Sequence, residues 1–157
     1  MDSNDGNDAN DGSLENLESK TIGTYDVPVE KVWKVISDFT NLEWVSYVSN
    51  VISEGNRVGS HRTVTIQSPE METFELVEEL TKLDNENHIT AITILKGPPL
   101  WAGAVCDMIA RKLDENKSEV EFRYKFDPGQ IPKSDAKKMA DYVFEVARDD
   151  LEKFLKR

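Results

Sequence analysis

The C-terminal segment constrains the fold more than any other part of the chain. From Pro132 to the end, apolar side chains recur at intervals of three and four, which predicts a long helix with one apolar face. Ser134 is placed to cap its first turn. The apolar stripe consists of Ala136, Met139, Ala140, Val143, Ala147, Leu151, Phe154 and Leu155. A stripe of this length must be buried, so the rest of the chain has to supply an extended apolar surface.

A β-sheet is predicted as that surface. The first strand is expected in "TIGTYDV", and the others in "SNVISEG", "SHRTVTIQ", "ETFELVEELTKL", "HITAITIL", "WAGAVCDMIARKL" and "SEVEFRYKF". Turn-rich clusters of hairpin length, such as "EGNRVG", "DNENH" and "DENKS", separate successive runs. The sequence therefore predicts an antiparallel, meandering sheet of about seven strands.

Two short helices are expected after the first strand. In "PVEKVWKVISDF", Pro28 suits the first helical position, and apolar residues follow at helical spacing. "TNLEWVSYV" is interpreted as a second short helix. The predicted fold class is α+β, with a curved antiparallel sheet wrapped around the long C-terminal helix.

Composition limits the partners of this domain. Residues 1–20 are acidic and nearly free of apolar side chains, which predicts a disordered tail before a domain at residues 21–157. The net charge is −11 and no basic stripe is present, so nucleic acid is not an expected partner. No apolar run is long enough for membrane insertion, and Cys106 stands alone. We expect a cytoplasmic protein without a disulfide, metal or cofactor.

Alternation indicates which side chains face the inside of the sheet. In "VEFRYKF" the apolar set is Val120, Phe122, Tyr124 and Phe126, and in "HRTVTIQ" the set is Arg62, Val64 and Ile66. "WAGAVCDMIA" places Ala104, Cys106, Met108 and Ala110 on one side. "ITAITIL" is ambiguous by alternation alone.

Glu78 is the unusual residue on this predicted inner face. In "FELVEEL" it shares the parity of Phe74, Leu76 and Leu80, where an unpaired carboxylate would be costly. Arg62 has inward parity and is an available partner. Three interpretations remain open: a polar anchor for a ligand, a purely structural ion pair, or a β-bulge that turns Glu78 to solvent.

The order of these segments resembles a known family. "PVEKVWKVISDFTNLEWV", "VGSHRTVTI", "ELTKLDNENHITAITILKGPPL" and "YKFDPG" are similar to the polyketide cyclase/dehydrase branch of the SRPBCC superfamily. This is the helix-grip fold of START-like and birch-pollen-allergen-like proteins. The resemblance implies an apolar cavity between the sheet and the long helix. It also favours Ile92 and Ile94 as inward-facing. In abscisic acid receptors, polar pocket groups match Arg62, Glu78 and Tyr124, and the loops that close over the ligand match residues 67–71 and 96–103.

The expected function is the binding of a small hydrophobic molecule, such as a lipid, sterol, polyketide or isoprenoid-like compound. The predicted ligand-binding residues are Arg62, Val64, Ile66, Glu78, Ile92, Ile94, Trp101, Cys106, Phe122, Tyr124, Met139 and Val143. Trp101 could instead pack at the rim of the cavity without a role in binding. Trp33 and Trp44 are expected in the core. A cyclase or dehydratase, with Glu78 as acid or base and Arg62 and Tyr124 assisting, is the first alternative. A chaperone-activator or protein-interaction module with a filled interior is the second.

Overall fold

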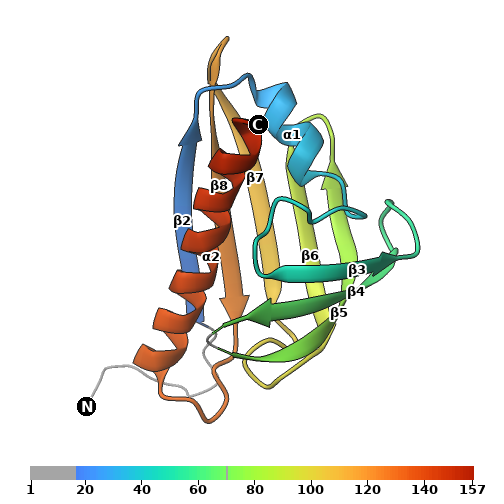
Figure 1. Cartoon of the computed structure of the whole chain (residues 1–157), viewed down its shortest axis with the longest axis vertical. Coiled ribbons are helices and arrows are strands. Elements are labelled where there is room, and N and C mark those ends of the chain that lie inside the picture. The colour runs from blue at the N-terminus through green and yellow to red at the C-terminus, as the bar shows by residue number, and fades with distance from the viewer. Residues whose placement is uncertain (1–16, 70) are drawn as a thin grey trace.

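The computed structural model describes residues 17–69 and 71–157 and contains one sheet and two helices (Figure 1). The elements, in chain order, are β2 (Leu17–Tyr25), α1 (Val29–Ile36), β3 (Val48–Ser53), β4 (His61–Ser68), β5 (Met71–Asp84), β6 (Ile89–Lys96), β7 (Val105–Asp114), β8 (Lys117–Phe126) and α2 (Lys133–Leu155). No helix in these ranges is long and apolar enough to cross a membrane. The predicted α+β helix-grip architecture is confirmed.

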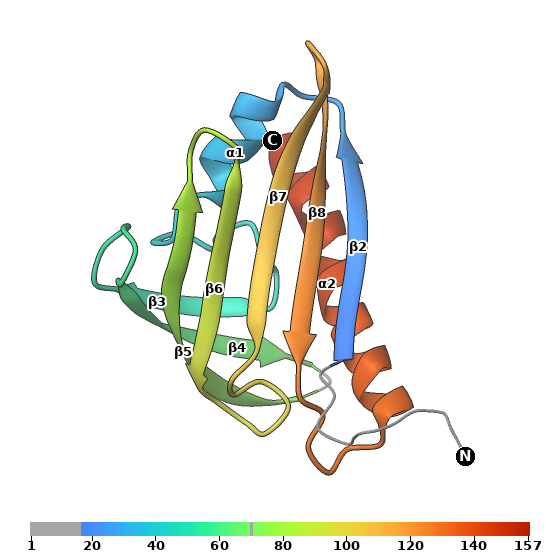
Figure 2. The same cartoon turned by 180° about the vertical axis from the view of Figure 1, so that it is seen from behind.

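The sheet has seven antiparallel strands in the order β2-β8-β7-β6-β5-β4-β3. From β3 to β8 it is the predicted meander, and β2 joins the far edge beside β8. Figures 1 and 2 show β3 and β4 running across the direction of β5 to β8, so the sheet curves strongly, and α2 lies on its concave side.

Polar contacts fix α2 along the β2 edge of the sheet. The Ser19 hydroxyl donates to Asp141 at 2.6 Å, and the Arg148 guanidinium donates to the Thr21 hydroxyl at 2.8 Å. The Tyr25 hydroxyl donates to the backbone carbonyl of Arg148 at 2.9 Å. The helix is therefore held at three points on one side of the molecule.

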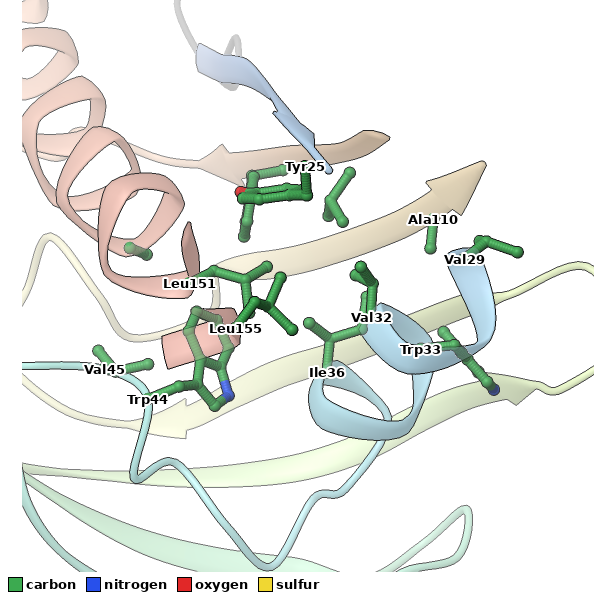
Figure 3. Close-up of a cluster of buried hydrophobic side chains, with 13 residues drawn as sticks. Tyr25, Val29, Val32, Trp33, Ile36, Trp44, Val45, Ala110, Leu151 and Leu155 are labelled. Carbon is green, nitrogen blue, oxygen red and sulfur yellow. The ribbon is translucent and has the colours of Figure 1, made fainter. Parts of the chain in front are cut away.

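One end of the concave side is densely packed, as Figure 3 shows. We call this cluster the packed end; its buried members are Tyr25, Val29, Val32, Trp33, Ile36, Trp44, Val45, Ala110, Val120, Phe122, Ala147, Leu151 and Leu155. Here α1 lies over the sheet beside the C-terminal part of α2. The apolar spacing of α1 predicted this burial, because all four of its periodic residues are inside.

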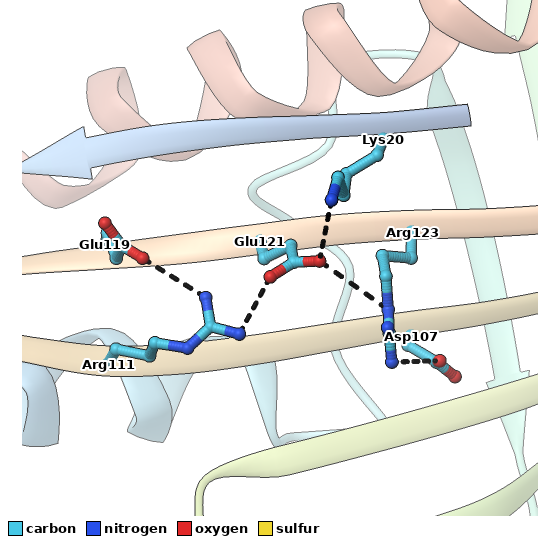
Figure 4. A network of polar contacts seen from close by, with 6 residues as sticks. All are labelled: Lys20, Asp107, Arg111, Glu119, Glu121 and Arg123. Carbon is cyan, nitrogen blue, oxygen red and sulfur yellow. Dashed lines mark hydrogen bonds and ion pairs between the residues drawn. The ribbon is translucent and has the colours of Figure 1, made fainter. Parts of the chain in front are cut away.

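The outer face carries an ion-pair network across β2, β7 and β8 (Figure 4). Arg111 contacts Glu121 at 2.8 Å and Glu119 at 3.1 Å, and Arg123 contacts Asp107 at 3.2 Å. Glu121 is buried beneath its partners. The polar residues of β8 therefore lie outside, as the alternation predicted.

Three local predictions were wrong. "TNLEWVSYV" forms turns leading into β3 rather than a second helix, so only one short helix follows the first strand. The long helix starts at Lys133 after Pro132, and no side chain caps it, so Ser134 lies inside the first turn. β7 begins at Val105, because residues 97–104 form turns.

The predicted end of the acidic tail at residue 20 also differs from the structure. Residues 1–16 lie outside the described residues, but Leu17 to Lys20 belong to β2 and pair with Phe126 to Arg123 of β8. Backbone hydrogen bonding to β8 brings this segment into the sheet although only Leu17 among its four side chains is apolar.

Candidate ligand-binding site

A cavity of about 110 Å³ lies between the concave face of the sheet and α2. Ten of the predicted ligand-binding residues line it: Arg62, Val64 and Ile66 from β4, Glu78 from β5, Ile92 and Ile94 from β6, Trp101, Cys106 from β7, Phe122 from β8 and Val143 from α2. The alternation of the strands therefore identified most of the wall. Whether these side chains contact a ligand stays a prediction.

Glu78 points into the cavity and pairs with Arg62. The two residues are direct partners in the β4–β5 register, and Arg62 Nε donates to Glu78 Oε1 at 2.7 Å. Glu78 is 5% exposed and Arg62 is 7% exposed. A register shift does occur beside Glu78, between β5 and β6, but it does not turn the carboxylate to solvent. The interpretation that a bulge exposes Glu78 was wrong.

Arg62 is held from a second side by the segment after α1. Its Nη1 donates to the Phe39 backbone carbonyl at 2.8 Å, and its guanidinium lies 4.2 Å from the centre of the Phe39 ring. These contacts fix the guanidinium in place, and Arg62 in turn fixes Glu78. Of the described residues that line the cavity, only these two are charged, so the wall is neutral overall.

The other ionisable groups beside the cavity are kept uncharged. Burial, with a further contribution from the Glu78 carboxylate, raises the pKa of the Cys106 thiol well above its usual range. Burial likewise raises the pKa of Tyr47 and of Tyr124 above the ordinary value of a phenol. Cys106 therefore serves as a small apolar wall residue, and the phenols remain hydrogen-bond donors.

Two predicted site residues do not line the cavity. Tyr124 faces inward but lies behind the wall, where it stacks on Phe126 and its hydroxyl donates to the Leu100 carbonyl at 3.3 Å. Met139 is 42% exposed on the outer side of α2, one position before the buried Ala140. The inclusion of Met139 was wrong, because it lies at the edge of the helical stripe rather than on its buried side.

Sequence reasoning missed the segment that closes the cavity. The turns after α1 contribute Leu42, Trp44, Val45 and Tyr47, and β3 begins with Val48; we call these five residues the turn wall. Trp44 was expected in the core; it is 6% exposed and also lines the cavity. Its indole Nε1 finds no acceptor among the described residues. The apolar content of this segment was a usable signal, but it was interpreted as helix.

Further wall residues were also missed: Leu76, Thr90, Met108, Phe144 and Ala147. Alternation had placed Leu76 and Met108 on the inner face without assigning them to the site. Thr90 donates to the Lys82 carbonyl at 3.3 Å, which satisfies its hydroxyl hydrogen within the protein.

A second pocket of about 280 Å³ lies outside the first. The two adjoin, because both are lined by Tyr47, Ile66, Trp101 and Val143; we call these four shared residues the partition. The outer pocket is also lined by Gln67, Ser68 and Pro69. Both loops expected at the cavity mouth therefore reach this region, the first through residues 67–69 and the second through Trp101.

Trp101 is the firmly held side of the partition. Its loop is tied to β6 by hydrogen bonds from Gly103 N to Ile94 O at 2.7 Å and from Ile94 N to Ala104 O at 2.9 Å. The ring also contacts Phe74 and Tyr124. On the opposite side the Tyr47 hydroxyl reaches the Val143 carbonyl only at 3.5 Å, the limit of a hydrogen bond.

The histidines are outside the cavity. His61 lies on the polar face of β4 and contacts Glu79 at 3.2 Å, and His88 occupies the β5–β6 turn at φ 57°. Within residues 17–69 and 71–157, no three His, Cys, Asp or Glu side chains gather in a way that could hold a metal ion.

Comparison with known proteins gives a family match and several structural likenesses. A family model described as polyketide cyclase / dehydrase and lipid transport matches residues 19–157. A search of curated proteins found no match. A putative uncharacterized protein from Bacillus thuringiensis superposes with a TM-score of 0.78 at 19% identity, covering 90% of this chain and 100% of that one.

Two further solved structures are similar. XoxI from Bacillus cereus has a TM-score of 0.76 at 19% identity, covering 88% of this chain and 94% of that one. The Zhui aromatase/cyclase from Streptomyces sp. R1128 has a TM-score of 0.74 at 15% identity, covering 90% of this chain and 94% of that one. At these identities the likenesses establish the fold alone.

Proposed function

Because the chain belongs to the polyketide cyclase/dehydrase and lipid transport family, we propose that it binds a small, largely apolar molecule in the cavity between the sheet and α2. The bound molecule presents a polar group to the Arg62–Glu78 pair. One observation carries this proposal: a buried, hydrogen-bonded ion pair faces an otherwise apolar cavity. Ligand sites in proteins have this composition, with few polar groups in an apolar wall.

The cavity volume limits which molecules fit. Pockets for drug-sized ligands measure roughly 300–1,000 Å³, and this cavity measures about 110 Å³. A sterol or long-chain lipid would therefore require the partition to open into the outer pocket of about 280 Å³. A compact ligand needs less room, so the volume of the cavity favours the small members of the predicted ligand set.

An acid–base enzyme is the second candidate, because Glu78 reaches the wall of the cavity. In that case Glu78 would exchange a proton with the substrate, while Arg62 stabilises developing negative charge. Tyr124 would have to leave its bond to Leu100 to assist. Deuterium exchange at carbon acids next to a carbonyl, in wild type but not in Glu78→Gln, would support this candidate. The internal cavity speaks against an interaction module with a filled interior.

Native mass spectrometry of the protein from its own source tests the binding function. We expect a retained small molecule, and addition of a binder at 100 times its Kd should stabilise the protein by about 2.7 kcal/mol. Val143→Phe, which places a ring in the cavity, should abolish both effects. If no molecule is retained and no lipid, polyketide or small-ring probe raises the Tm, the binding proposal fails. The cytoplasmic location remains a prediction.

A further inference from the structure

We propose that the molecule held in the cavity is neutral, about the size of one substituted six-membered ring, and donates a hydrogen bond to Glu78. This inference rests on the proposed function and narrows it to one chemical class, small ring alcohols and phenols. It follows from three properties of the cavity: its charge, its hydrogen-bonding groups and its volume.

The charge of the wall excludes ionic ligands. Arg62 already donates to Glu78 Oε1 and to the Phe39 carbonyl, and its face lies against the Phe39 ring. An anionic ligand would meet no uncommitted cation among the described wall residues and would lie beside the Glu78 carboxylate. A cationic ligand would meet a carboxylate that Arg62 already neutralises. Burying either kind of ion without a counter-charge is costly, so a neutral molecule is favoured.

The hydrogen-bonding groups of the wall suit a hydroxyl, which can donate to Glu78 and also accept. As donors the wall offers the Trp44 indole Nε1, which has no acceptor among the described residues, and the N–H groups of Arg62 beyond the two that bond to Glu78 and Phe39. A carboxylate offers about four acceptor sites, and the bond from Arg62 Nε uses one of them. The nearby hydroxyl of Thr90 donates its hydrogen to the Lys82 carbonyl, so towards a ligand it can only accept. Hydrogen bonds to an ionised acceptor are the stronger kind. A ligand hydroxyl would therefore find its best partner in Glu78.

The volume limits the ligand to roughly one ring. An apolar cavity of about 150 Å³ is known to accept benzene. This cavity, at about 110 Å³, is smaller, so a ring with a substituent fits only if it also extends toward the adjoining outer pocket of about 280 Å³. Of the four residues shared with the outer pocket, Ile66, Trp101 and Val143 are each at most 8% exposed, whereas Tyr47 is partly exposed. Aromatic and branched aliphatic side chains, including Trp44, Phe122 and Ile92, form the wall that a flat apolar ring would contact.

Four probes of similar size test the inference by isothermal titration calorimetry at pH 7. They are 4-methylphenol, para-xylene, 4-methylbenzoate and 4-methylbenzylamine, which present a neutral donor, no donor, an anion and a cation at one position. We expect 4-methylphenol to bind about tenfold to a hundredfold more tightly than para-xylene. The two ions should bind more weakly than para-xylene.

Two variants assign the preference to the ion pair. In Arg62→Met/Glu78→Leu both charges are replaced together, so no unpaired charge stays buried, and 4-methylphenol should lose its advantage over para-xylene. Glu79→Gln changes the neighbouring carboxylate on the outer side of β5 and should preserve the preference. Circular dichroism first establishes that each variant is folded; if the double variant is unfolded, the probe series on wild type decides alone.

The outcomes separate this inference from the proposed function. Equal affinity for 4-methylphenol and para-xylene, or tightest binding of either ion, overturns the inferred ligand class. Binding of oleate or cholesterol without binding of any ring probe overturns the size limit and leaves the proposed function standing. If neither the rings nor the lipids bind, the proposed function fails and the inference fails with it.

Discussion

The same sheet and the same helix build two ends of different character. At the packed end, α1 and the C-terminal part of α2 fill the concave side, and residues such as Val32 and Leu151 are 0% exposed. Next to it, at what we call the hollow end, the sheet and the middle turns of α2 enclose the cavity, whose wall also includes Trp44, Val45, Phe122 and Ala147 of the packed end. The difference lies in the covering elements: α1 contributes only to the packed end, whereas the turns after α1 contribute Trp44 and Val45 to both ends.

The two ends also differ in what stabilises them. Both ends contain a buried apolar cluster, but the hollow end also contains a charged pair. The hollow end buries the Arg62–Glu78 pair, which is costly unless it is fully satisfied. This contrast teaches that stability and binding capacity are separated along α2, so substitutions at the two ends should behave differently. Four predictions test that separation, starting with the largest effect.

Removing one member of the ion pair should be the most damaging change. Arg62→Met leaves Glu78 buried without its partner and should lower the free energy of unfolding by about 3–5 kcal/mol. Arg62→Met/Glu78→Leu should recover most of this loss. Urea denaturation measures both variants. Equal stability of the single and double variants would show that the hollow end does not depend on the pair.

Truncating the packed end should cost nearly as much. Leu151→Ala removes a fully buried side chain from the cluster in Figure 3 and should cost about 2–5 kcal/mol. Binding of a cavity ligand should persist in the folded fraction, because Leu151 does not line the cavity. Calorimetric titration below the Tm checks this. A selective loss of affinity would contradict the separation of the two ends.

Adding one methylene group should change the stability of the protein in opposite directions at the two ends. Val143→Ile places it in the cavity and should stabilise by about 0.5–1 kcal/mol while weakening binding. Val32→Ile, also on a helix, overpacks a side chain at 0% exposure and should destabilise by about 1 kcal/mol or more. Chemical denaturation of both variants measures the two changes in the free energy of unfolding. Equal signs would mean that the hollow end is as tightly filled as the packed end.

The smallest expected effect concerns Cys106 and pH. Because burial raises the pKa of this thiol, the folded state holds the proton more tightly than the unfolded state. Its contribution to stability is therefore present below pH ~8.5, the ordinary thiol pKa, and declines as pH rises further. Cys106→Ala should flatten this part of the stability curve. Alkylation by iodoacetamide at pH 8 should be slow in the folded protein; rapid labelling would contradict burial of the thiol.

Strand alternation predicted much of the site because it is a local property. Side chains two residues apart must share a face, so the inward positions of Arg62, Val64 and Glu78 followed from the sequence. The partnership of Arg62 and Glu78 required only that their strands be neighbours. These predictions needed no knowledge of the loops.

The turn wall could not be predicted in the same way. Irregular backbone has no period, so the spacing of Leu42, Trp44 and Tyr47 resembled a helix without specifying where each side chain points. The pairing of Leu17 with Phe126 brings together the first and last strands of the chain, which most of the sequence separates, and composition cannot reveal this. The prediction that Met139 lines the site was wrong because each step along a helix rotates the side-chain direction by about 100°, so a residue next to a buried one can face solvent.

The fastening of α2 to β2 has a consequence for the timing of ligand exchange. Because Ser19, Thr21 and Tyr25 hold the helix on that edge, the turn wall is the part of the enclosure that we expect to yield when a molecule enters. If opening of the turn wall limits the rate at which a ligand enters the cavity, association rates should be similar for all ring compounds and well below the diffusion limit. Differences in affinity would then appear as differences in residence time.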